Sequence, residues 1–172
     1  PAYKQEDYQS KEVSALSFDE KQIPISIIAH QDVDLSRPNP LLLMPYGVSD
    51  GFLESAFSVQ RISLLERGVV FATCQVRGID GPQWFLQDWE LGIPLSVSDF
   101  TACIDQLLLL GYTNTNKFAI AGEGVQGMLI ATMVNKHPEK FVVASVRNPL
   151  TDIADLFIKD QTQSSLGDKD KL

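Results

Sequence analysis

The chain has 172 residues, of which 44% are hydrophobic, and this is enough for one domain with a core of its own. Its 22 acidic and 14 basic residues leave a net charge of −8, which argues against nucleic acid and membrane surfaces as partners because both repel an acidic protein. No apolar run approaches the ~20 residues that a membrane span needs.

The first part of the chain predicts a β-hairpin, because apolar and polar residues alternate on both sides of a short polar turn. The strands are expected at 12–18 and 23–29, with the turn at 19–21. A loop rich in Asp and Pro follows at 31–40.

Buried strands then alternate with helices. Four apolar runs predict strands that are covered on both faces: 41–44, 69–76, 117–121 and 141–146. Three stretches have apolar residues at helical spacing: 55–67, 98–110 and 125–136. Ser98 is expected to cap the second helix, and 77–97 to form a long loop. We therefore predict an α/β fold, with a mostly parallel sheet, helices on both faces and an antiparallel hairpin at the start.

The most specific local feature is the turn Gly122-Glu123-Gly124-Val125-Gln126-Gly127, which lies between a predicted strand and a predicted helix. It matches the dinucleotide fingerprint, in which glycines let a pyrophosphate approach a helix N-terminus. That fingerprint normally follows the first strand of its domain, and Arg147 stands near the place of the acidic residue that holds the ribose, which would suit NADP. The turn equally fits a nucleophile elbow, in which a serine would stand at position 124. A purely structural glycine turn is the third interpretation.

A series of short motifs distinguishes between these interpretations. It includes Ile23-Pro24-Ile25-Ser26, Tyr46-Gly47, Leu64-Leu65-Glu66-Arg67-Gly68, Val76-Arg77-Gly78, Gln83-Trp84, Ser98-Asp99-Phe100, Gly111-Tyr112-Thr113 and Lys117-Phe118-Ala119-Ile120. In this order and spacing, over about residues 11–155, the chain resembles the hydrolase domain of the prolyl oligopeptidase family of serine peptidases, and within it oligopeptidase B.

The resemblance implies that residues 1–172 form the N-terminal and central part of an α/β-hydrolase domain. Where the family has Gly-Gly-Ser-x-Gly-Gly, this chain has Gly124 in the nucleophile position, so the serine is absent. Tyr46 corresponds to the tyrosine that helps to bind the oxyanion, and the backbone N–H of Val125 to the second donor. The family's catalytic Asp and His come later in chain order, and we expect neither them nor the family's β-propeller in this chain.

We therefore expect a non-catalytic homologue that serves as a structural or binding module, without a cofactor or a metal. Its expected partners are the remainder of the hydrolase domain or another protein chain, either of which would complete the sheet, and peptides. Cys74 and Cys103 are expected to be buried free thiols, which favours the cytoplasm. Two alternatives stay open: an active serine oligopeptidase for short peptides, inactivated or truncated in this sequence, and an NADP-binding protein that uses Gly122–Gly127.

Overall fold

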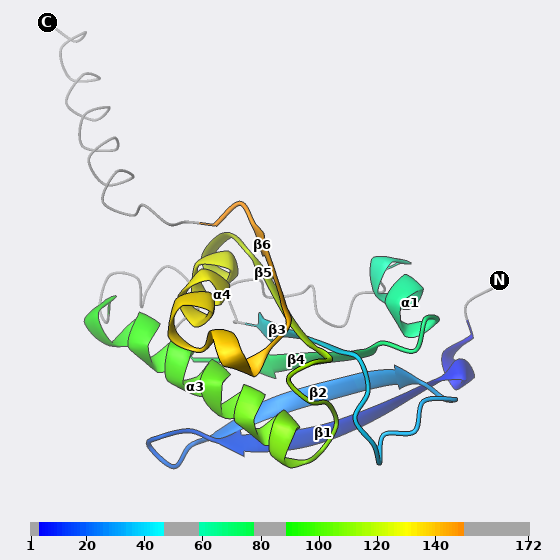
Figure 1. Ribbon diagram of the computed structural model, residues 1–172. Coiled ribbons are helices and arrows are strands. Elements are labelled where there is room, and N and C mark those ends of the chain that lie inside the picture. The colour runs from blue at the N-terminus through cyan, green and yellow to red at the C-terminus, as the bar shows by residue number, and fades with distance from the viewer. Residues whose placement is uncertain (1–3, 47–58, 78–88, 150–172) are drawn as a thin grey trace, which may run out of the picture.

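The structure is a computed structural model that describes residues 4–46, 59–77 and 89–149 (Figure 1). Its helices and strands are, in chain order, η1 (Gln5–Asp7), β1 (Tyr8–Leu16), β2 (Gln22–His30), β3 (Leu41–Tyr46), α1 (Val59–Leu65), β4 (Val70–Gln75), α3 (Trp89–Leu109), β5 (Phe118–Glu123), α4 (Gly124–Lys136), η3 (Pro138–Lys140) and β6 (Val143–Arg147).

The strands of the described residues form one sheet in the order β1-β2-β4-β3-β5-β6. β1 and β2 are an antiparallel hairpin, and β2 also runs antiparallel to β4. From β4 to β6 all neighbouring strands are parallel. The predicted α/β fold with a hairpin at its start is therefore confirmed.

Helices cover both faces of the sheet. Side chains alternate between the faces along each strand, and the fully buried side chains of Ile25, Leu43 and Ala72 belong to the same cluster as Phe100 and Ile104 of α3. α4 lies beside α3 on this face (Figure 1). On the opposite face α1 packs against β4, where the guanidinium of Arg61 lies 4.8 Å from the centre of the Phe71 ring.

The predicted loop at 77–97 and the predicted helix start at Ser98 are wrong in part, because α3 already begins at Trp89 and contains Pro94. A proline inside a helix removes one backbone hydrogen bond, and this local signal favoured a loop. The structure places Pro94 at the surface, while Ser96 and Val97 just after it are buried. Burial of the turns that follow Pro94 thus offsets the lost hydrogen bond.

The predicted buried strand at 141–146 is also corrected. β6 is exposed at all five of its residues, because it lies at the edge of the described sheet and β5 is its one neighbour there. Val143 and Val146 retain 53% and 38% of their accessible surface. The described part of the chain thus ends its sheet on an apolar strand.

Two further expectations concern the cysteines and the first helix. Cys74 and Cys103 are free and buried, as predicted. The predicted helix at 55–67 is seen as α1, and its first four positions, 55–58, lie outside the described residues. Within the described residues no helix is both long and apolar enough to cross a bilayer.

Candidate functional site

The turn between β5 and α4 is as tight as the sequence predicted. β5 ends at Glu123 and α4 begins at Gly124, so no residue separates strand from helix. Gly124 has φ +58°, in the left-handed region that residues with a Cβ rarely adopt. A Cβ built at this position meets no atom within 4 Å, so a side chain there would point into open space.

Close packing excludes a side chain at Gly122 and leaves little room for one at Gly127. A Cβ at Gly122 would lie 2.7 Å from the backbone carbon and oxygen of Gln126, and one at Gly127 would lie 3.2 Å from the carbonyl oxygen of Arg147. Small residues on both sides of a strained, outward-facing position are the geometry of a nucleophile elbow. The chain keeps that geometry and has no side chain at its apex.

Val125 is the second residue of α4, and its side chain is half-buried against the core. The first N–H groups of a helix have no partner within that helix. The backbone N–H of Val125 therefore lies at the end of α4 that faces a bound anion in helix-terminus sites. Its assignment as an oxyanion donor remains a prediction.

Tyr46 is the last residue of β3, which pairs in parallel with β5. The carboxyl ends of parallel strands meet at one edge of a sheet, where α/β proteins bind their ligands. Tyr46 and the turn at Gly124 are thus on the same edge and on neighbouring strands. The side chain of Tyr46 is half-buried, and its carbonyl oxygen accepts a hydrogen bond of 3.0 Å from the N–H of Val76.

A pair of opposite charges lies next to the turn. Glu123 and Arg147 are register partners on β5 and β6, and Arg147 Nη1 lies 3.4 Å from Glu123 Oε2. The NADP alternative needs Arg147 for a ligand phosphate, and it needs the glycine turn on the first strand rather than on β5. In the structure Arg147 pairs with Glu123, and the glycine turn follows β5. Both observations count against the NADP alternative, which stays an untested prediction.

Sequence reasoning missed a cluster of charged residues at the end of β4. The carboxylate of Asp99 is fully buried and accepts hydrogen bonds from Arg77 and from the hydroxyl of Ser17. The hydrogen bonds to Asp99 and then to Asp19 raise the pKa of Arg77 above its ordinary value. The hydrogen bond from Arg77 lowers the pKa of Asp19. The sequence did contain a signal for this cluster. Asp99 stands next to Phe100 on the apolar face of a predicted helix, and a buried carboxylate needs a partner of opposite charge.

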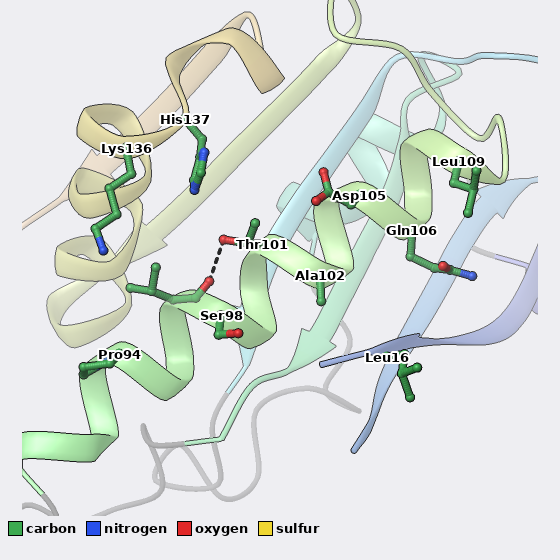
Figure 2. A pocket seen from close by; sticks show the side chains of 11 residues that line it. Leu16, Pro94, Ser98, Thr101, Ala102, Asp105, Gln106, Leu109, Lys136 and His137 are labelled. Atoms are coloured by element: carbon green, nitrogen blue, oxygen red, sulfur yellow. Dashed lines mark hydrogen bonds between the residues drawn. The ribbon is translucent and has the colours of Figure 1, made fainter. Parts of the chain in front are cut away.

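An open hollow of about 740 Å³ lies over α3, beside the carboxyl end of α4 (Figure 2). Leu16 and Leu109 line it together with Lys136 and His137. None of the three predicted site residues lines this hollow, so it is distinct from the turn between β5 and α4. The other histidine, His30, is the last residue of β2.

Comparison with known proteins identifies the same family that the sequence motifs indicate. A family model described as "Prolyl oligopeptidase family" matches residues 55–168. Dipeptidyl aminopeptidase BI of Pseudoxanthomonas mexicana is 31% identical over 157 residues, which cover 89% of this chain and 22% of that protein. Protease 2 of Moraxella lacunata is 27% identical over 153 residues, 88% of this chain and 22% of the relative. The chain thus spans about a fifth of the length of the curated relatives that it matches.

Solved structures of oligopeptidase B have a similar arrangement of strands and helices over most of this chain. The enzyme from Leishmania major superposes with a TM-score of 0.70 at 29% identity, over 81% of this chain and 20% of that one. The enzyme from Trypanosoma brucei, with covalently bound antipain, gives 0.71 at 28% identity, over 83% of this chain and 21% of that one. The described sheet therefore corresponds to part of an α/β-hydrolase domain.

Proposed function

The chain belongs to the prolyl oligopeptidase family, and we propose that it is a non-catalytic member that serves as a structural or binding module. The observation that carries the proposal is Gly124, which stands at the apex of the turn between β5 and α4 with φ +58°. Acyl transfer by a serine peptidase requires a hydroxyl at the apex of the elbow, because that oxygen attacks the carbonyl. Glycine offers no such group.

Peptides are the ligand class that we propose for the site. Two relatives are named for acting on peptides, dipeptidyl aminopeptidase BI and prolyl endopeptidase. Tyr46 at the end of β3 and the backbone N–H of Val125 at the start of α4 lie at the carboxyl edge of the sheet, as does Gly124, the position without a side chain. Hydrogen-bond donors at this edge would bind a peptide carbonyl without cleaving the peptide bond.

The second part of the proposal concerns β6. Its backbone edge and the apolar side chains of Val143 and Val146 are exposed in the described part of the sheet. Exposed apolar edge strands readily pair with further strands. We propose that sequence beyond the described residues, a different protein or a second copy of the chain completes the sheet. The two free, buried cysteines accord with a cytoplasmic location for the assembly.

A fluorophosphonate probe, which phosphonylates activated serines with loss of fluoride, tests the loss of catalysis. We expect no labelling of the natural protein under conditions that label an intact oligopeptidase B. Labelling of the natural protein would show that another nucleophile acts and would end the non-catalytic proposal.

Gly124→Ser is the matched variant for this experiment. The open space around position 124 admits the serine side chain, although φ +58° costs about 1–2 kcal/mol for a residue with a Cβ. Labelling of Gly124→Ser alone would identify the glycine as the cause of the lost reactivity. If neither protein is labelled, the groups that would activate a serine are missing as well, and the non-catalytic proposal stands on both counts.

A further inference from the structure

The main chain just after β4 is held at three polar groups of two consecutive residues, Val76 and Arg77. The N–H of Val76 donates to the carbonyl oxygen of Tyr46 at 3.0 Å. The N–H of Arg77 donates to Oδ2 of Asp99, also at 3.0 Å. The carbonyl oxygen of Arg77 accepts a hydrogen bond of 2.6 Å from the hydroxyl of Ser96. Strand ends usually open easily, and this one is fixed from two sides.

The side chain of Arg77 strengthens the attachment to α3. Its Nε and Nη2 atoms donate to the two carboxylate oxygens of Asp99 at 2.9 and 2.7 Å. This is a planar fork, which fixes orientation as well as distance. Asp99 is fully buried on α3, in the same helix face as Phe100, so solvent does not compete for its oxygens.

A second carboxylate holds the outer side of the same guanidinium. Asp19, in the turn of the β1–β2 hairpin, accepts hydrogen bonds of 2.7 and 2.9 Å from Arg77 Nη1 and Nη2. Its side chain is 32% exposed, whereas that of Asp99 is 0% exposed. Exposed ion pairs contribute little because water and salt screen them. The buried Asp99 is therefore the stronger of the two restraints.

We propose that Asp99 is a positioning residue for the candidate site: it fixes Arg77, Arg77 fixes the end of β4, and Val76 at that end holds the backbone of Tyr46. Among the described hydrogen bonds, those of Asp99 go to Ser17 and Arg77 and not to Tyr46, Gly124 or Val125. The proposal rests on the proposed function in one respect, namely that Tyr46 belongs to the peptide-binding edge. The proposal gives a reason for the burial of a carboxylate on α3.

Amide hydrogen exchange in the full chain tests the proposal with Asp99→Asn, which preserves shape and removes the charge. We expect the amide of Val76 to exchange about ten-fold faster than in the unmodified protein, and the amide of Ile120 in β5 to change far less. The ring resonances of Tyr46, assigned with Tyr46→Phe, should shift. The matched control is Asp19→Asn, which removes the exposed partner and should leave Val76 and Tyr46 nearly unchanged.

Equal acceleration at Val76 and Ile120 would mean that Asp99 stabilises the whole fold, and the positioning role would be wrong. The positioning role would also be wrong if Asp99→Asn left the exchange rate of the Val76 amide unchanged. If Asp99→Asn does not fold, the exchange rates of the Val76 and Ile120 amides are measured in Arg77→Lys instead. Lysine keeps the positive charge but cannot form the paired hydrogen bonds of the guanidinium to Asp99. Labelling of the unmodified protein by the fluorophosphonate would overturn the proposed function alone, so the two failures are distinguishable.

Discussion

Glu123 and Arg147 face each other across β5 and β6 with 3.4 Å between the guanidinium and the carboxylate, and Gly124 follows Glu123 directly. The resemblance to the oligopeptidases implies glycine at position 123. Here a carboxylate stands at the start of α4, where the helix dipole favours negative charge. Because Arg147 offsets part of the charge of Glu123, we expect the positive end of α4 to outweigh this carboxylate at position 124.

A thiol placed at position 124 should therefore be unusually acidic. We expect Gly124→Cys to have a thiol pKa about one unit below the usual value of about 8.5, because the N-terminus of a helix stabilises a thiolate. The pH dependence of its reaction with a thiol reagent measures this value. Cys74 and Cys103 are fully buried and should contribute little to the background.

Gly111→Cys is the matched control for this measurement. Gly111 also has a left-handed φ, +75°, and open space around a built Cβ, but it follows the carboxyl end of α3. The dipole of that helix disfavours a thiolate there, so its pKa should be at or above the usual value. Equal pKa values for the two variants would contradict the elbow geometry.

Gly122→Ala should destabilise the fold more than an ordinary substitution of glycine. Its Cβ would lie 2.7 Å from the backbone of Gln126 and 2.9 Å from Cγ1 of Ile130, so strand and helix would have to separate. We expect a loss of about 3 kcal/mol in the free energy of unfolding, measured with urea. Gly68→Ala has open space and φ +77°, and should lose only about 1 kcal/mol. An equal loss in both variants would show that the contact at Gly122 relaxes without cost.

The ion pair between Asp19 and Arg77 should make stability depend on pH in the acid range. The pKa of Asp19 in the folded protein lies below the usual 3.8, chiefly because Arg77 donates hydrogen bonds to its carboxylate. A lowered pKa means that the stabilisation is fully present above pH 3.8 and is lost as the pH falls through the folded-state pKa. Asp19→Asn should therefore be less stable than the unmodified protein at neutral pH, and this difference should vanish in acid.

Urea unfolding of both proteins across this range checks the prediction. Glu12→Gln is a suitable control, because this substitution also removes one exposed carboxylate. Glu12 forms no ion pair among the described contacts, whereas Asp19 pairs with Arg77. A difference between Asp19→Asn and the unmodified protein that persists undiminished in strong acid would show that the charge of Asp19 is not its cause.

Local patterns were sufficient for most of the fold. The strands β2, β3, β4 and β5 and the helix α4 lie within a few residues of where periodicity and glycines predicted them, whereas β1 begins at Tyr8, four residues before the predicted strand. The turn at Gly122–Gly127 was recognisable as well, because a strand that enters a helix without a linker leaves a short glycine pattern in consecutive residues. The same pattern fitted three functions, since a dinucleotide site, a nucleophile elbow and a structural turn all need glycine for close backbone approach.

Residues that are neighbours along the chain establish the α/β class, the hairpin and the absence of a side chain at position 124. Three other features follow from the three-dimensional packing alone. α3 continues through Pro94 because its next turns are buried, and β6 is exposed because it forms the described edge of the sheet. Arg77 meets Asp99 and Asp19 because a strand, a helix and a hairpin turn converge there. These features depend on contacts between residues far apart in sequence, and periodicity along the chain does not encode them.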